Sequence, residues 1–139
     1  MFKKIIIVLL ATSSLLGYQP QRIEAGELPN KTQEQYIQDI FGAKAKVATA
    51  VLKHESGMKL NAINYNCRYN GKSTFCKKGD EYKAWSVDCG IAQVNTKGTV
   101  CPEHLLTLEG NMQAVEKIYK EQGLNAWVSY KNKAYLQFM

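Results

Sequence analysis

The sequence predicts an α+β domain that is mostly helical, with a small disulfide-linked β-hairpin lobe and a cleft between the two lobes. Three observations support this prediction. Amphipathic segments with helix-start and helix-stop signals lie toward both ends of the chain. The middle, residues 58–101, is rich in Asn, Tyr, Gly, Lys and Ser and holds short alternating stretches. All four cysteines lie within that middle segment.

An export signal is expected before the domain. Phe2-Lys3-Lys4 supplies a positive start, Ile5 to Leu16 is mostly apolar, and Ala25 is a small residue suited to cleavage. The apolar run is too short for a membrane-spanning helix, although an uncleaved anchor is the alternative. We therefore divide the 139 residues into a signal peptide, 1–25, and one domain, 26–139.

The charge of the chain favours an anionic partner. The formal net charge is +6, and cleavage after Ala25 would remove three positive charges and one negative charge, leaving +4. An exported protein with a moderate positive charge is suited to binding an anionic polymer such as a bacterial wall. The positive residues are dispersed and no nucleic-acid motif is present, so no nucleic-acid partner is predicted. A cationic membrane-active protein is the other reading of the charge, but no strongly basic amphipathic helix supports it.

Helix signals flank the middle segment. Thr32-x-x-Gln35 is a capping box that opens a helix ended by Gly42. A second helix is expected from about Ala43 to Ser56, with a glycine C-cap. Its apolar stripe consists of Val47, Ala48, Val51 and Leu52. A third helical region is expected from about Pro102 to Gly123, and a last helix or turn over residues 125–138.

The cysteines predict two disulfides. An even number of cysteines behind an export signal is typical of a disulfide framework, and without a CxxC pair zinc is not expected. Asn70-Gly71 marks a turn, and a four-residue loop, Asn70 to Ser73, would place Cys67 opposite Cys76. We prefer Cys67–Cys76 and Cys89–Cys101 to the other two connectivities.

Glu55 is the sharpest chemical feature. It follows Leu52 by three residues, Val51 by four and Ala48 by seven, which places its carboxylate on the apolar face of the helix. An ionised carboxylate there would be poorly solvated, so the position suits an acid that donates a proton to a leaving-group oxygen. On periodicity alone, a helix-end Glu that points into solvent explains the pattern equally well.

Two further segments carry groups that suit a sugar. In the first, Asp88 precedes Gly90, where the backbone can be approached closely, and Gln93 and Asn95 offer amides. In the second, Trp127 and Tyr130 lie three residues apart and could share a helix face. These aromatics are either an aromatic wall beside the acid or core packing, and the pattern alone favours core packing for the tryptophan.

Three segments resemble the lysozyme-like superfamily. Lys53-His54-Glu55-Ser56 resembles the helix-ending Glu-Ser of SLT-type lytic transglycosylases and lysozymes. Asp88 to Asn95 resembles the Asp-Tyr-Gly-Ile-Leu-Gln-Ile-Asn stretch of animal-type lysozymes and the Gly-Leu-Met-Gln motif of lytic transglycosylases. Leu124 to Asn132 resembles Asn-Ala-Trp-Val-Ala-Trp-Arg-Asn-Arg of animal-type lysozymes. The segments occur in the family's order and span about residues 43–135.

The resemblance implies an exported peptidoglycan glycosidase that acts on the glycan strands, without a metal or cofactor. Glu55 would be the general acid and Asp88 the second carboxylate. The implied substrate-binding residues are Ser56, Gly90, Gln93, Asn95, Trp127 and Tyr130. The resemblance favours a lytic transglycosylase over a lysozyme-type hydrolase, and a non-catalytic glycan-binding protein is a further alternative.

The chain also departs from that family. The 33 positions from Glu55 to Asp88 exceed the spacing in animal lysozymes, and the last helix ends soon after Tyr135. The short signal and compact domain resemble small transglycosylases associated with secretion systems or phage. An envelope apparatus is therefore an implied partner.

Overall fold

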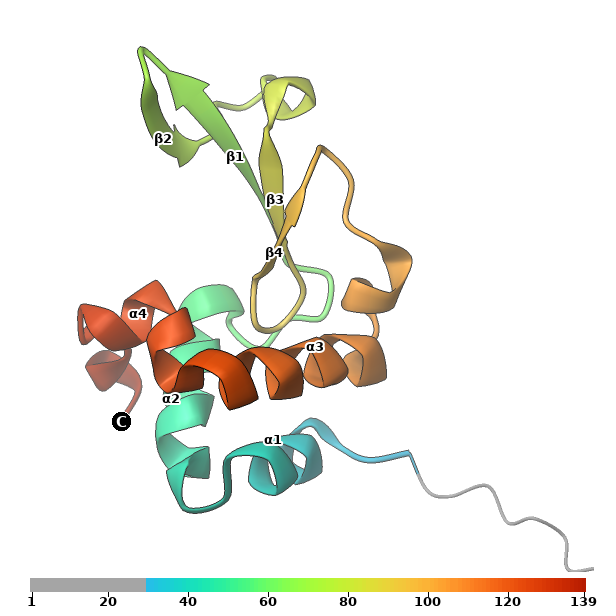
Figure 1. The fold of residues 1–139 in the computed structure, drawn as a ribbon, viewed down its shortest axis with the longest axis vertical. Coiled ribbons are helices and arrows are strands. Elements are labelled where there is room, and N and C mark those ends of the chain that lie inside the picture. Colours follow the sequence, from blue (N-terminus) through green and yellow to red (C-terminus); the bar gives the residue numbers. More distant parts are fainter. Residues whose placement is uncertain (1–29) are drawn as a thin grey trace, which may run out of the picture. The chain divides into compact units, whose positions relative to one another are not determined.

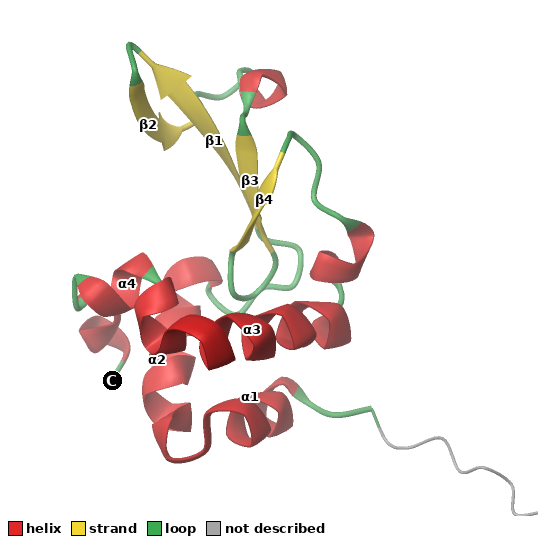
Figure 2. Cartoon of the chain, viewed as in Figure 1, coloured by secondary structure: helices red, strands yellow, loops and turns green. Residues whose placement is uncertain are grey.

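Helices and an antiparallel sheet occupy different regions of the chain (Figure 1). The computed structural model describes residues 30–139, so the predicted signal peptide, residues 1–25, lies outside the described residues. The helices are α1 (Gln33–Phe41), α2 (Ala45–Ser56), α3 (Leu108–Gln122) and α4 (Val128–Lys131). The strands are β1 (Ile63–Tyr69), β2 (Lys72–Phe75), β3 (Ser86–Cys89) and β4 (Val94–Lys97). Figure 2 shows the strands consecutive in the chain between α2 and α3, which confirms the predicted α+β class.

The predicted signals begin and end α1, and the predicted glycine ends α2. The Gln35 backbone N–H donates to Thr32 Oγ1 at 3.2 Å, and the Thr32 N–H donates to Gln35 Oε1 at 2.8 Å, so the capping box is present. Gly42 ends α1 with φ 51°, and a short 3₁₀ turn delays α2 by two residues relative to the prediction. Gly57 ends α2 in the left-handed conformation that glycine adopts without a steric cost.

The C-terminal helical region is more broken than the sequence suggests. A 3₁₀ helix, Glu103–Leu106, precedes α3, which Thr107 caps by accepting from the Gly110 N–H. Beyond α3, where a last helix or turn was expected over residues 125–138, the chain forms several short helical turns, because Trp127 is extended between them. Within residues 30–139, no helix is both long and apolar enough to cross a bilayer.

The sheet has the strand order β2-β1-β3-β4, with every neighbouring pair antiparallel. β1 and β2 are joined by a two-residue turn in which Asn70 has φ 50° and Gly71 has φ 76°. Two positive φ values are typical of the type I′ turn that Asn-Gly favours. The four-residue loop over Asn70 to Ser73 was therefore a wrong prediction, since Tyr69 and Lys72 already pair.

Both predicted disulfides are confirmed, Cys67–Cys76 and Cys89–Cys101. Because the turn is shorter than predicted, the geometry of the Cys67–Cys76 disulfide differs from the one expected. Cys67 lies opposite Thr74 in the sheet, and the Cys76 N–H donates to the Tyr65 carbonyl just beyond the end of β2. The pairing was predicted correctly although the cysteines are not directly opposite each other.

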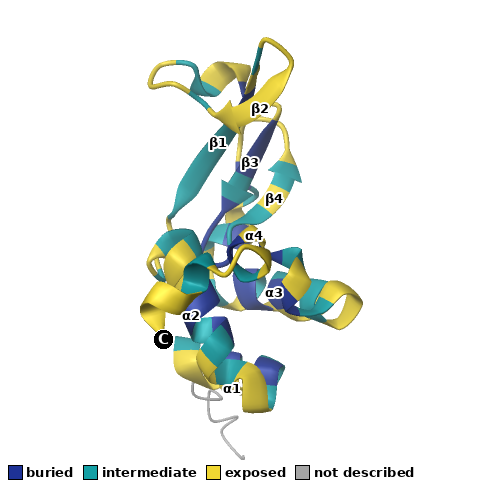
Figure 3. Ribbon diagram, turned by 90° about the vertical axis from the view of Figure 1, so that its left-hand side faces the viewer, coloured by how far each residue is buried: buried dark blue, intermediate teal, exposed yellow. Residues whose placement is uncertain are grey.

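The two faces of the sheet differ in character. Alternation along the strands and their register place the apolar side chains Val87 and Cys89 on one face, where they pack with Leu105 and Cys101. The other face, called the polar face below, carries Asn64, Asn66, Arg68, Ser86, Asp88, Asn95 and Lys97. Figure 3 shows β3 as largely buried and β2 as exposed.

The main core joins the helices to the loop between β3 and β4. Its buried members are Ile37, Phe41, Ala48, Val51, Leu52, Ile91, Ala92, Met112, Val115, Leu124 and Trp127. The predicted apolar stripe of α2 is thereby largely buried, and it faces the same core as α3. Because Ile91 and Ala92 belong to the loop that follows Asp88, the sheet is fixed against the end of α2.

Hydrogen bonds to the Asp80 carboxylate hold the loop after β2 against the apolar side of β1. Lys83 Nζ donates to Asp80 Oδ1 and Tyr69 Oη donates to Asp80 Oδ2, each at 2.7 Å. The hydrogen bonds from Lys83 and Tyr69 lower the pKa of the Asp80 carboxyl, and the bond to Asp80 raises the pKa of the Tyr69 hydroxyl. The Asp80 carboxylate is therefore bonded to Lys83 and Tyr69 on the apolar side of the sheet.

Candidate active site

Glu55 and Asp88 line one cavity of about 400 Å³. Its walls come from the end of α2, the start of α4, the polar face of the sheet and the loop between β3 and β4. The lining residues are His54, Glu55, Asn64, Phe75, Asp88, Gln93, Asn95, Ala126, Trp127 and Val128. A volume of several hundred Å³ with a few polar groups is typical of small-molecule sites. The structure thus brings the two predicted carboxylates to a shared space.

The Glu55 side chain is half-buried in the last turn of α2. Ser129, which is 2 % exposed and lies in α4, donates from Oγ to Glu55 Oε1. The contact joins residues 74 positions apart in the chain. Because one carboxylate oxygen is held by a buried hydroxyl, the side chain is fixed in a defined orientation at the edge of the cavity.

Asp88 lies in β3 on the polar face and has a hydrogen-bond donor on each oxygen. Asn95 Nδ2 donates to Oδ1 at 2.7 Å, and Asn66 Nδ2 donates to Oδ2 at 2.9 Å. The same two amides also contact the buried Ser86 hydroxyl, at 3.1 and 3.3 Å. Strand register causes this grouping, because Asn95 is directly opposite Asp88 and Asn66 is directly opposite Ser86. Asp88 is therefore held in place by both neighbouring strands.

The two amides predicted to meet a sugar have different surroundings. Gln93 donates from Nε2 to the Gly90 and Ala62 carbonyls at 2.9 and 3.2 Å, and accepts from Asn64 Nδ2 at 2.6 Å. Its polar atoms thus stabilise the loop that contains it. Asn95 is exposed, and its Oδ1 accepts no hydrogen bond from any other part of residues 30–139. Asn95 is the better placed of the two to contact a ligand.

Gly90 is buried and has φ +71°. A Cβ atom there would lie 2.3 Å from Asn111 Nδ2 and 2.4 Å from the Leu105 carbonyl oxygen. The buried Asn111 side chain occupies that space, donating to the Cys89 and Leu105 carbonyls and accepting from the Ala92 N–H. The glycine therefore permits the packing of α3 against the loop, and it is not among the residues that line the cavity.

Ser56 has a comparable structural contact. Its hydroxyl donates to the Ile91 carbonyl at 2.6 Å, which connects the end of α2 directly to the loop after β3. Ser56 is not among the lining residues of the cavity. Its position keeps Glu55, the preceding residue, at a fixed place relative to Asp88.

Of the two aromatic residues predicted to face the site, Trp127 lines the cavity and Tyr130 does not. Trp127 is 6 % exposed, belongs to the main core and donates from Nε1 to the Ala92 carbonyl at 2.9 Å, yet it also lines the cavity. Tyr130 instead stacks on Tyr135 with ring centroids 5.4 Å apart and is not in the lining. The aromatic surface of the cavity comes from Trp127 and the exposed Phe75.

Several side chains that belong to the site were not identified from the sequence. Ser129 stands where the similar segment of animal-type lysozymes has Ala, and that difference was the available signal. Asn64 and Asn66 had no signal, because their proximity to Asp88 depends on strand register. His54 is exposed and also lines the cavity. Within the described residues, no group of three or more His, Cys, Asp or Glu side chains is placed to hold a metal ion.

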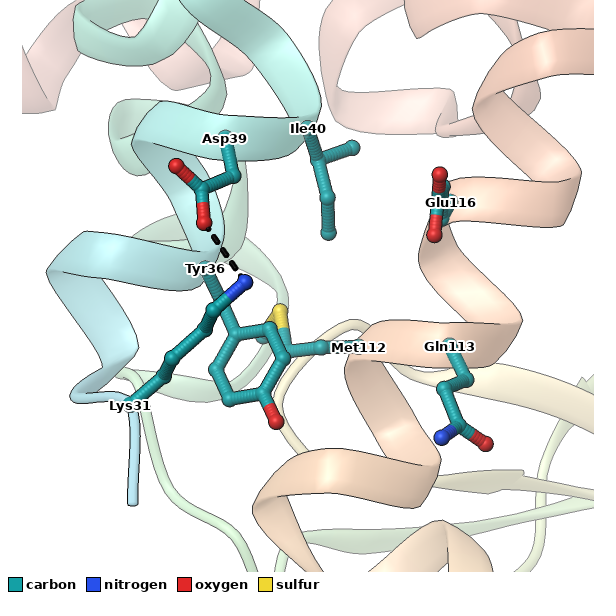
Figure 4. A pocket seen from close by; sticks show the side chains of 7 residues that line it. All are labelled: Lys31, Tyr36, Asp39, Ile40, Met112, Gln113 and Glu116. Atoms are coloured by element: carbon teal, nitrogen blue, oxygen red, sulfur yellow. Dashed lines mark ion pairs between the residues drawn. The ribbon is translucent and has the colours of Figure 1, made fainter. Parts of the chain in front are cut away.

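A smaller cavity of about 150 Å³ lies between α1 and α3 (Figure 4). Lys31 Nζ and Asp39 Oδ2 form an ion pair at 2.8 Å on one side, and Glu116 and Gln113 of α3 lie on the other. It contains none of the predicted site residues, so the candidate site is the cavity with Glu55.

Fold and site define an α+β chain in which two carboxylates share a cavity between helices and a polar sheet face. No protein-family model, no curated protein and no solved structure matches the chain. The function is therefore inferred from the residues and their geometry.

Proposed function

We propose that this chain is an exported peptidoglycan glycosidase of the lysozyme-like superfamily, and that it acts as a lytic transglycosylase. The β-1,4 bond between N-acetylmuramic acid and N-acetylglucosamine is the proposed point of cleavage. The observation that carries the proposal is Glu55, a half-buried carboxyl at a helix end, oriented by Ser129 into the cavity that Asp88 and Trp127 also line. The two disulfides are in keeping with an exported protein.

In the proposed reaction, Glu55 donates its proton to the glycosidic oxygen as the bond from that oxygen to the muramic C1 breaks. The Glu55 carboxylate then removes the proton from the muramic 6-hydroxyl, whose oxygen attacks C1. The product has a 1,6-anhydro end, water is not consumed, and Glu55 is protonated again. Ser129 would support both steps because it holds Oε1 and leaves Oε2 without a hydrogen bond to residues 30–139.

Hydrolysis is the alternative chemistry at the same site. Water would then complete the reaction, and Asp88 would be the nucleophile or would stabilise the developing positive charge. The amides of Asn66 and Asn95 hold both Asp88 oxygens, which favours a charge-stabilising or orienting role over nucleophilic attack. A charge-stabilising Asp88 fits both reactions, and the resemblance of the sequence to lytic transglycosylases is what makes transglycosylation the leading proposal.

Mass spectrometry of the soluble products from purified peptidoglycan tests this proposal. We expect muropeptides that are lighter by one water than reducing muropeptides, and we expect none from a Glu55→Gln control. Reducing ends that take up labelled oxygen from water would contradict transglycosylation and support the hydrolase. A complete absence of soluble products from the wild-type protein would exclude both.

Replacing Ser129 by Ala is expected to lower kcat by about 10- to 100-fold with little change in KM. The hydroxyl contacts the acid and not the substrate, and the loss of one hydrogen bond to a charged group is worth about 1.5–3 kcal/mol. Rates of release of soluble muropeptides measure the effect. Ser129→Thr, which keeps the hydroxyl, should retain more activity than the Ala variant. An increase in KM alone would contradict a role in positioning Glu55.

A further inference from the structure

The polar face of the sheet continues beyond the cavity. Asn64 lines the cavity, and Asn66 and Arg68 follow on the same face of β1 because strand side chains alternate. At about 3.3 Å per residue, Arg68 lies about 13 Å along the strand from Asn64. Phe75, directly opposite Asn66, extends the cavity lining in the same direction. A polymer bound in the cavity can therefore run along this face toward Arg68.

Arg68 is held in place by an aromatic ring and not by an ion pair. Its guanidinium carbon lies 4.7 Å from the ring centroid of Trp85, which is 41 % exposed. Stacking on an aromatic ring restricts a guanidinium while leaving its edge N–H groups available to an anion. Arg68 is exposed, and it forms no ion pair with any residue between 30 and 139.

The charges near Arg68 favour an anion. Lys97, opposite Ser86 on the polar face, is also exposed and also lacks an ion-pair partner among residues 30–139. The carboxylate of Asp80 lies with Tyr69 on the other side of β1 and is already bonded to Lys83. Asp88, the acid on the polar face, is bound by two amides. Beyond Asp88, the charged strand residues of this face are Arg68 and Lys97.

We infer that Arg68, stacked on Trp85, binds a carboxylate of the peptide stem that peptidoglycan strands carry, and this inference rests on the proposed function. The sugar hydroxyls and acetamido groups are uncharged, and the lactyl carboxyl of each muramic acid is held in the amide bond to its stem, so the free carboxylates of a peptide-bearing strand belong to the stem peptides. The planar fork of an arginine matches a carboxylate in two parallel hydrogen bonds. Arg68 would thus make the site prefer strands that still bear peptides over bare glycan.

The test compares two substrates, intact peptidoglycan and the same polymer after an amidase has removed its peptides, which leaves a carboxylate only on the lactyl group of each muramic acid. We expect the wild-type kcat/KM to be higher on the peptide-bearing polymer. Arg68→Gln should lower kcat/KM about tenfold on that polymer, mainly through KM, and should leave the rate on bare glycan unchanged. Lys72→Gln is the matched control, since Lys72 is exposed but pairs with Tyr69 and lies on the opposite face.

Three results would overturn the inference. Equal wild-type rates on the two polymers would show that peptides are not recognised. An equal loss by Arg68→Gln on both polymers would assign Arg68 to the glycan itself or to the fold, and the same loss in Lys72→Gln would reduce the effect to net charge. If the wild-type protein cleaves neither polymer, the proposed function fails first and the inference fails with it.

Discussion

Replacing Glu55 by Gln is expected to lower the turnover of peptidoglycan by about 10²–10⁴-fold, the usual contribution of a general acid. Glutamine has nearly the same shape, and its Oε1 can still accept the hydrogen bond from Ser129. Its amide, however, has no acidic proton to give to the glycosidic oxygen. The fold and the affinity for the wall should therefore be preserved while bond cleavage is lost.

The measurement is the release of soluble muropeptides, with co-sedimentation of the protein and insoluble peptidoglycan run in parallel. Glu121→Gln is a suitable control, because Glu121 is exposed at the end of α3 and carries the same change in charge. Undiminished release by Glu55→Gln would rule out Glu55 as the general acid. Loss of both cleavage and binding would instead place Glu55 in substrate binding.

Replacing Asn111 by Ala is expected to be the most destabilising of these changes, lowering the free energy of unfolding by about 3 kcal/mol or more. The substitution leaves the carbonyls of Cys89 and Leu105 and the N–H of Ala92 buried without their partner. Each such group costs about 1–3 kcal/mol, and the removed side chain also leaves a void beside Gly90.

Chemical denaturation followed by far-UV circular dichroism measures this change in stability. Gln113→Ala, two residues along the same helix and exposed, is the matched control and should change stability by less than about 0.5 kcal/mol. A similar small effect for Asn111→Ala would contradict a structural role for the asparagine. The Cys89–Cys101 disulfide must stay oxidised in both variants, since it lies in the same part of the structure.

The helices were largely predictable because their signals are local. The capping box at Thr32 and the glycines Gly42, Gly57 and Gly123 act on neighbouring residues and need no knowledge of the rest of the chain. The broken C-terminal region was not predictable in the same way. There the extended conformation of Trp127 accompanies a hydrogen bond to Ala92, 35 residues earlier.

The candidate site was predictable only in part, because some of its residues are positioned by local signals and others by contacts between distant parts of the chain. The periodicity of α2 places Glu55 beside its apolar stripe, and the structure finds the side chain half-buried there. The donors around Asp88 depend on the register of β1, β3 and β4, which a one-residue slip would change entirely. The turn at Asn70 shows the difficulty, since its length was mispredicted although its location was correct.

The hydrogen bond between Glu55 and Ser129 also has a consequence for when the molecule becomes active. The two residues are 74 positions apart, and Ser129 lies in a helix of four residues near the C-terminus. During synthesis, α2 emerges from the ribosome long before its partner α4. The hydrogen-bonded Glu55–Ser129 pair therefore exists only after α4 has been synthesised and has packed against α2.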